Sequence, residues 1–166
     1  TFSYIWDFTG GTPISSNLLH PDTITYNNIG NYTPQVIVSS ECGIDSASTT
    51  VVVNSLPNVN AGTYAPICLG NSISLNATGA NSYIWNNNVN NGQAFTPSTY
   101  GNFTYTVVGT DANGCTNTDQ TMITVYQLPN VGAGSYAPIC FGDPIALFGT
   151  GAVSYSWNHG VPNGQN

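Results

Sequence analysis

The sequence predicts an all-β chain of β-sandwich modules in tandem, with almost no helix. The stretch from Leu56 to Gln93 returns as Leu128 to Gln165, 72 residues further on, and such a period indicates an array of similar folding units. Thr, Val, Ile and Tyr are plentiful and are interspersed with 18 Gly and 10 Pro, as in short strands joined by turns. No segment shows a sustained apolar period of 3.6, so helices are not expected.

Residues 55–127 carry about seven short strands with turn signals between them, the pattern of a sandwich. The alternation of apolar and polar residues predicts two strands that each have an apolar face. One strand points Ile73, Leu75 and Ala77 to one face, and the other does the same with Phe103, Tyr105 and Val107. Asn113 and Gly114 form a hairpin signal between the last two strands.

The repeat divides the chain into three parts. We expect residues 1–54 to be a module lacking its N-terminal part, residues 55–127 a complete repeat, and residues 128–166 the truncated start of a further repeat. The chain is therefore expected to be a piece of a longer array. Pro57 and Pro129 fix φ near each junction, which favours a semi-rigid rod, and Pro34 predicts an edge position or a bulge in its strand.

The charge composition excludes several classes of partner. Lys and Arg are absent, and charged residues make up 4 % of the chain, against about 25 % in ordinary domains. A chain without cations does not neutralise phosphates, so neither nucleic acid nor an anionic membrane surface is expected as a partner. No apolar run reaches the roughly 18 residues of a membrane span, so no direct membrane insertion is expected. Absence of trypsin sites suits an extracellular protein.

The four cysteines are interpreted through the repeat. Cys140 corresponds to Cys68 and Cys42 to Cys115, so we expect one disulfide within the chain, between Cys68 and Cys115. An alternative stays open. If the first turn and the last hairpin lie at opposite ends of the sandwich, the two Cα atoms exceed the limit of about 7 Å, and each cysteine would pair with a neighbouring module. No CxxC motif or Cys/His cluster predicts a metal site.

No residue pattern predicts an enzyme. The seven carboxylates are scattered without an acid–base spacing, and His20 and His159 lie among turn residues without a nucleophile motif. The Asp111–Gly114 stretch lacks the alternating ligands of a calcium loop and is better explained as a hairpin turn. A structural calcium ion between modules, at Asp119 or Asp45, remains open; no other cofactor is expected.

Trp6, Trp85 and Trp157 occupy one module position, each near the end of an alternating strand. This position favours a core aromatic packed over the sheet. The alternative is that the three indoles are platforms for stacking against sugars.

Residues 1–54 resemble the PKD domain, an immunoglobulin-like β-sandwich. The matching positions are Trp6, Asp7, Phe8, Pro21, Tyr26, Gly30, Tyr32, Val51 and Val53. Where that family reads WDFGDG, this chain reads WDFTGG, so the second aspartate is missing. The resemblance implies tandem immunoglobulin/PKD-like modules.

The stretches Leu56–Gly79 and Gly79–Asp119 are similar to repeats of very large Bacteroidota cell-surface adhesins. These include gliding-motility adhesins of the SprB type, which the type IX secretion system exports. The resemblance implies an extracellular, cell-surface filament for attachment or gliding. Surface polysaccharide or another substratum would be bound by regions outside this chain, and the type IX secretion machinery would be a partner during export.

Two short motifs predict that the chain is covalently modified. Asp22-Thr23-Ile24 and Asp45-Ser46-Ala47 resemble the O-glycosylation motif of Bacteroidota surface proteins, which implies glycans on Thr23 and Ser46. The competing function for the whole chain is a set of spacer or carbohydrate-binding modules attached to a secreted hydrolase. The number of repeats discriminates between the two, because an adhesin should continue the 72-residue period many times.

Overall fold

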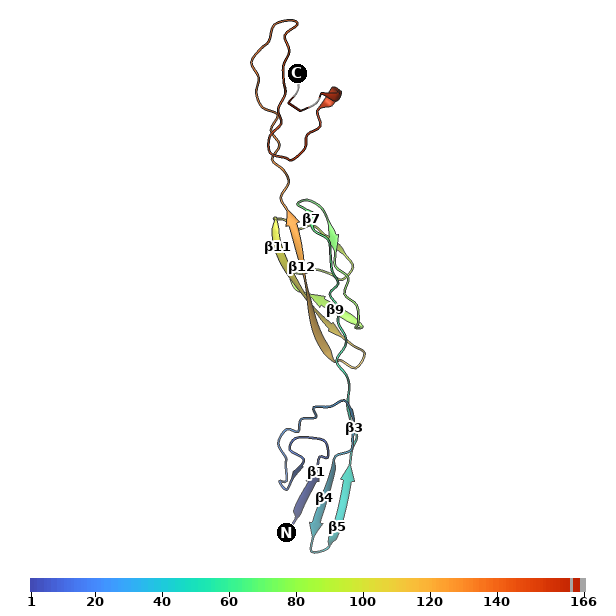
Figure 1. The fold of residues 1–166 in the computed structure, drawn as a ribbon. Coiled ribbons are helices and arrows are strands. Elements are labelled where there is room, and N and C mark those ends of the chain that lie inside the picture. Colours follow the sequence, from blue (N-terminus) through green and yellow to red (C-terminus); the bar gives the residue numbers. More distant parts are fainter. Residues whose placement is uncertain (162, 165–166) are drawn as a thin grey trace.

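The computed structural model describes residues 1–161 and 163–164. Figure 1 shows three parts that follow one another along one long axis, with the N-terminus at one end. Strands dominate, and the helical element found in these ranges is the 3₁₀ turn η1 (Asn158–Gly160). The predicted all-β class of tandem sandwich modules is confirmed. No helix in the described ranges has the length and apolar character needed to cross a membrane.

The first part contains a four-stranded and a two-stranded antiparallel sheet. The larger sheet has the order β2 (Ser15–Ser16), β1 (Ser3–Asp7), β4 (Gln35–Ser40) and β5 (Gly43–Ser48), and the smaller pairs β3 (Gly30–Tyr32) with β6 (Val51–Val53). Pro34 lies between β3 and β4, and its carbonyl accepts a hydrogen bond from the Thr49 amide at 3.1 Å. Proline has no N–H for the ladder, and the strand run is interrupted there. The predicted edge position or bulge is wrong, because Pro34 lies outside both strands.

The second part is a complete sandwich of two sheets. One sheet has the order β7 (Ile67–Cys68), β12 (Thr116–Tyr126), β11 (Gly101–Thr110) and β9 (Ser82–Trp85), and the other pairs β10 (Ala94–Phe95) with β8 (Ile73–Ser74). The β11–β12 hairpin is antiparallel along the whole of β11. β7 runs parallel to the C-terminal end of β12, where Cys68 lies opposite Tyr126. A parallel pair of this kind requires a long connection between its strands.

The core of the second part forms between the β11–β12 hairpin and the residues that precede it. We call residues 55–92 the N-half of the module. The N-half contributes Val59, Ala61, Leu75, Ala77, Trp85 and Val89 to the core, and the hairpin contributes Tyr105, Val107, Ile123 and Val125. The predicted alternation is confirmed, because Leu75 and Tyr105 are buried while Asn76 and Thr104 beside them are exposed.

One glycine in the N-half is required by close backbone packing. Gly79 has φ +91°, and a Cβ placed there would lie 1.8 Å from the carbonyl oxygen of Asn58. Its repeat equivalent, Gly151, has φ +86° and would place a Cβ 1.9 Å from the Asn130 carbonyl oxygen. A side chain fits neither the backbone conformation nor the space at this position.

The third part reproduces the local hydrogen bonds of the N-half without forming strands in its described residues. The isolated bridge between Asn60 and Thr78 recurs between Gly132 and Thr150. In the second part the Tyr64 hydroxyl donates to the Asn76 carbonyl and accepts from the Asn76 amide, and in the third part Tyr136 does the same with Phe148. The third part therefore has the turns of the N-half, and no hairpin covers them within the described residues.

Candidate functional site

The structure contradicts the predicted Cys68–Cys115 disulfide. Cys68 lies beside the C-terminal end of β12, and Cys115 directly precedes the N-terminal end of the same strand. β12 is 11 residues long, which corresponds to about 35 Å at the usual rise of a strand. Bridged Cα atoms must lie within about 7 Å, and all four cysteines are free thiols. The repeat gave correct equivalences between cysteines but said nothing about which end of the sandwich each one occupies.

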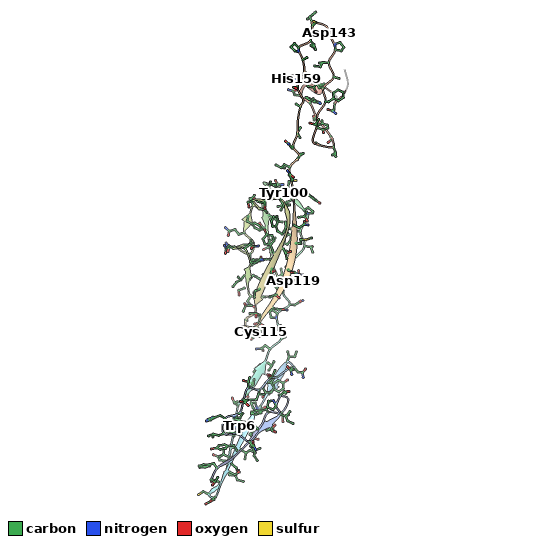
Figure 2. The ribbon with its side chains drawn as sticks, turned by 90° about the vertical axis from the view of Figure 1, so that its left-hand side faces the viewer. Trp6, Tyr100, Cys115, Asp119, Asp143 and His159 are labelled. Carbon is green, nitrogen blue, oxygen red and sulfur yellow. The ribbon has the colours of Figure 1, made fainter. Side chains whose placement is uncertain are left out.

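The remaining alternative is a bridge to a neighbouring module. Figure 2 shows Cys115 at the end of the second part that faces the first, with Tyr100 at the opposite end. Cys68 is exposed and Cys115 is half-buried. Pairing between modules stays a prediction, because the described residues contain no cysteine partner beside either thiol.

The indole N–H of each of the three tryptophans donates a hydrogen bond, but the three side chains differ in burial. Trp85 is 4 % exposed and belongs to the core, so its ring faces are not available to a sugar. Trp6 and Trp157 are half-buried. Each indole N–H donates a hydrogen bond: Trp6 to the Leu18 carbonyl, Trp85 to Asn91 Oδ1 and Trp157 to Asn163 Oδ1.

Four carboxylates accept hydrogen bonds from nearby backbone amides and are thereby tied to the fold, and one of them, Asp7, accepts from the Thr9 amide at 2.9 Å. Asp111 accepts from the amides of Asn113 and Cys115 and so organises the turn of the β11–β12 hairpin. Asp45 accepts from the following amide, and Asp143 accepts from the Cys140 amide. Among the described residues no three His, Cys, Asp or Glu side chains gather into a group that could hold a metal ion.

Asp119 makes a long-range contact that positions the start of the second part. Its Oδ2 accepts a hydrogen bond from the Ala61 amide at 2.7 Å, and Figure 2 shows it along the strand that begins near Cys115. Hydrogen bonds from the backbone amides of Ala61 and Gln120 lower the pKa of this carboxyl below its ordinary value. A calcium ion would compete for this oxygen, so the calcium prediction gains no support at Asp119.

The remaining predicted residues lie on the surface. Thr23 is exposed outside any strand, and Ser46 is exposed on β5, the last strand of its sheet. His20 and His159 are exposed, and His159 has a left-handed backbone with φ 58°, at the position where Asn87 has φ 55°. In the hydrogen bonds of the described residues, neither histidine contacts a carboxylate or a nucleophilic side chain.

Open hollows occur on all three parts. One of about 280 Å³ on the first part is lined by Phe2, Val38, Ser40, Cys42, Gly43, Ile44 and Asp45. One of about 410 Å³ beside β9 is lined by Tyr83, Ile84, Trp85, Asn88, Val89 and Asn90. None of the side chains that line the hollow beside β9 is a carboxylate, an imidazole or a thiol. A groove of about 370 Å³ in the third part is lined by Val131, Gly132, Ala133, Gly149, Ser154, Tyr155, Ser156 and Trp157.

Sequence reasoning missed the polar side chains that hold the N-half together. Asn91 Oδ1 accepts from the Ala77 amide at 2.8 Å and from the Trp85 indole at 3.0 Å. Asn163 accepts from Gly149 and Trp157 in the same manner. The available signal was the identity of Tyr64 with Tyr136 and of Asn91 with Asn163 across the repeat, in a region where many other Asn residues change.

Comparison with protein-family models and with curated proteins finds no match. Among solved structures, the chain is similar to one described as "Structures of Clostridium thermocellum CbhA fibronectin(III)-like modules". The identity is 14 %, the match covers 75 % of this chain and 78 % of that chain, and the TM-score is 0.37.

Proposed function

We propose that this chain is an extracellular structural and adhesive repeat segment of a large bacterial cell-surface adhesin that serves surface attachment or gliding. The observation that carries the proposal is the repetition of one hydrogen-bonded N-half at a spacing of 72 residues along an extended chain. Such modules act by their number and reach, because each contacts mainly its neighbours and adds length.

The composition supports an exposed location. The chain lacks Lys and Arg, and the second part is stabilised by apolar burial and backbone pairing. Serine proteases that cleave after basic residues find no site in it. Bound substratum, such as a surface polysaccharide, would be recognised by regions outside this chain, and the type IX secretion machinery would export it.

Glycans on Thr23 and Ser46 belong to this proposal. Both side chains are exposed, so a transferase would reach them in the folded module. Intact-mass and peptide mapping of protein purified from the source cell should find hexose-containing additions at these two positions. Unmodified Thr23 and Ser46 would remove this element of the proposal.

The location is tested with antibodies raised against residues 55–127. We expect them to label intact, unpermeabilised cells of the source bacterium, and deletion of the coding region to reduce attachment to glass or gliding. A cytoplasmic protein serves as the negative control for permeabilisation. Labelling that requires permeabilisation would contradict the proposal.

The same antibody separates the adhesin from a secreted hydrolase with spacer modules. The polypeptide that it precipitates should be very large and should contain many 72-residue repeats. A short polypeptide that carries a few repeats and hydrolyses polysaccharide would favour the hydrolase instead.

A further inference from the structure

Three Asn-Gly pairs occur in the chain, and the structure places them in different environments. They are Asn91-Gly92, Asn113-Gly114 and Asn163-Gly164. Such a pair is chemically reactive, because glycine has no Cβ to block attack by its backbone nitrogen on the asparagine side chain. The attack requires that the asparagine turns its Cγ towards the next peptide nitrogen and that this nitrogen leaves its hydrogen bond. The hydrogen bonds of each pair therefore decide whether it reacts.

The pair Asn91-Gly92 is locked by three hydrogen bonds. Asn91 Oδ1 accepts from the Ala77 amide at 2.8 Å and from the Trp85 indole at 3.0 Å. The Gly92 amide donates to the carbonyl of the fully buried Leu75 at 2.7 Å. Turning the Asn91 side chain would leave two donors without an acceptor, which costs free energy.

The pair Asn163-Gly164 is held by the equivalent bonds of the third part. Asn163 Oδ1 accepts from the Gly149 amide at 2.7 Å and from the Trp157 indole at 3.1 Å. The Gly164 amide donates to the Leu147 carbonyl at 2.7 Å. Two of the three pairs are thus tied at both the side chain and the backbone nitrogen.

The pair Asn113-Gly114 lies at the exposed turn between β11 and β12 and is held loosely. The Gly114 amide donates to the Asp111 carbonyl at 3.2 Å. Asn113 Nδ2 lies 3.5 Å from Asp111 Oδ2, and its Oδ1 accepts none of the hydrogen bonds found in the described part of the chain. A Cβ placed on Gly114 would meet no heavy atom within 4 Å. An exposed turn of this kind opens locally at a much smaller free-energy cost than a core segment.

We propose that Asn113 is the site of spontaneous deamidation in this chain. The Gly114 nitrogen loses its proton and forms a bond to Asn113 Cγ, the bond from Cγ to Nδ2 breaks, and ammonia leaves. Water then opens the resulting five-membered succinimide at either of its carbonyls, which gives aspartate or isoaspartate at position 113. Water is the only co-reactant, and no atom is oxidised or reduced.

The modification changes the turn that carries it and goes beyond the proposed adhesive function. Asp111 organises this turn by accepting from the amides of Asn113 and Cys115. A second carboxylate beside it repels it, and the chain has no Lys or Arg to offset the added charge. Isoaspartate also lengthens the backbone of the turn by one methylene. Because Cys115 lies at the end of the second part that faces the first (Figure 2), the modification loosens the hairpin at that end.

The test incubates the full 166-residue chain in mildly alkaline buffer and takes samples over time. Acid stops the reaction, pepsin cuts the chain, and mass spectrometry measures the fraction of each asparagine that has become aspartate or isoaspartate. We expect Asn113 to react at least about tenfold faster than Asn91, since the exposed turn opens far more often than the segment tied to Leu75.

Two controls separate the effect of structure from that of sequence. In concentrated urea both pairs are freed, so the rate at Asn91 should rise until it is similar to the rate at Asn113. Gly114→Ala places a methyl group beside the attacking nitrogen and should slow the reaction at Asn113 in the folded and the unfolded chain alike. It should leave the reaction at Asn91 unchanged.

Equal rates at Asn113 and Asn91 in the folded chain would overturn the proposal. So would a rate at Asn113 that rises in urea as much as the rate at Asn91 does, because the turn would then protect its pair as strongly as the core protects the other.

Discussion

At the scale of single residues, the second part depends on polar contacts that link segments far apart in sequence. Asn91 Oδ1 joins the amide of Ala77 to the indole of Trp85, and Asp119 joins β12 to the Ala61 amide. Tyr64 contributes a third link through the Asn76 backbone. Each of these side chains fixes an irregular segment that has no regular backbone pairing of its own to hold it in place.

Replacing Asn91 tests the first link. In Asn91→Ala, the Ala77 amide and the Trp85 indole lose their acceptor, and unsatisfied donors in partly buried positions cost about 1–3 kcal/mol. We expect this decrease in the free energy of unfolding of the second part, measured by denaturant titration with tryptophan fluorescence. Asn90→Ala is the control, because Asn90 contacts only the exposed Gln93 side chain in the described hydrogen bonds. Equal effects of the two variants would contradict the assigned role.

Gly79 tests the effect of backbone crowding. Gly79→Ala should destabilise the second part by more than about 2 kcal/mol, because it combines a left-handed backbone with overlap against the Asn58 carbonyl. Gly70→Ala is a matched control, since Gly70 has φ +94° and no heavy atom within 4 Å. The control isolates the conformational cost alone. Thermal unfolding should rank Gly79→Ala below Gly70→Ala, and a reversed order would refute the crowding explanation.

The lowered pKa of Asp119 predicts that the free energy of unfolding of the second part depends on pH. Its pKa is lowered in the folded state by hydrogen bonds from backbone amides, so folding favours the ionised form. The stabilisation is present above the ordinary value of 3.8 and is lost as the pH falls through the lowered pKa. The difference in unfolding free energy between wild type and Asp119→Asn should therefore shrink from pH 7 towards about pH 2.

The control for this pH series is Glu41→Gln, which removes one negative charge from an exposed loop residue. Glu41 lies in the first part, so the unfolding free energy of the second part should be the same in this variant as in wild type at each pH. A constant difference for Asp119→Asn across the series would show that its carboxylate is not stabilised by the Ala61 amide.

At the scale of elements, the β11–β12 hairpin decides whether an N-half has a core. Leu75 is fully buried beneath the hairpin, while its repeat equivalent Leu147 is half-buried. The residue type is the same, so the difference in environment comes from the hairpin. The alternation that buries Leu75 was predictable from sequence because it is a local pattern with period 2.

The two leucines form a matched pair for mutation. Leu75→Ala should lower the free energy of unfolding of the second part by about 2–5 kcal/mol, the range for truncating a buried leucine. Leu147→Ala should change that same transition by less than about 0.5 kcal/mol, as expected for distant, independent sites. Unfolding is followed by hydrogen exchange of the β11 and β12 amides. A large effect of Leu147→Ala on them would mean that the second part depends on the third.

At the scale of the whole molecule, the two cysteines of the second part lie near its ends. Cys68 and Cys115 lie at opposite ends of β12, which leaves them positioned towards different neighbours along the chain. A bridge between modules would cross-link successive units, whereas a bridge within one module would only restrain that unit.

Cysteine mapping tests this placement. In the purified chain without reductant, iodoacetamide should label Cys68 and Cys115 separately, with half-buried Cys115 reacting more slowly than exposed Cys68. Peptides are generated with pepsin, since the chain has no trypsin sites. Recovery of a Cys68–Cys115 linked peptide from monomeric chain would contradict the strand arrangement.

The sequence alone determined the fold class, the 72-residue repeat and the inward faces of the main strands. These properties depend on local periodicity and on the comparison of one stretch with its copy. The roles of Asn91 and Asp119 were not predictable, because their partners lie in segments that meet only after folding.

Tertiary structure decided where the ends of the strands lie. β7 pairs in parallel with the last residues of β12, so Cys68 is carried to the end opposite Cys115. Tertiary structure also decided that Val131 is exposed while its copy Val59 is buried. Identical residues reach different states because burial depends on what packs against them, and among the described residues no hairpin packs over Val131 as the β11–β12 hairpin does over Val59.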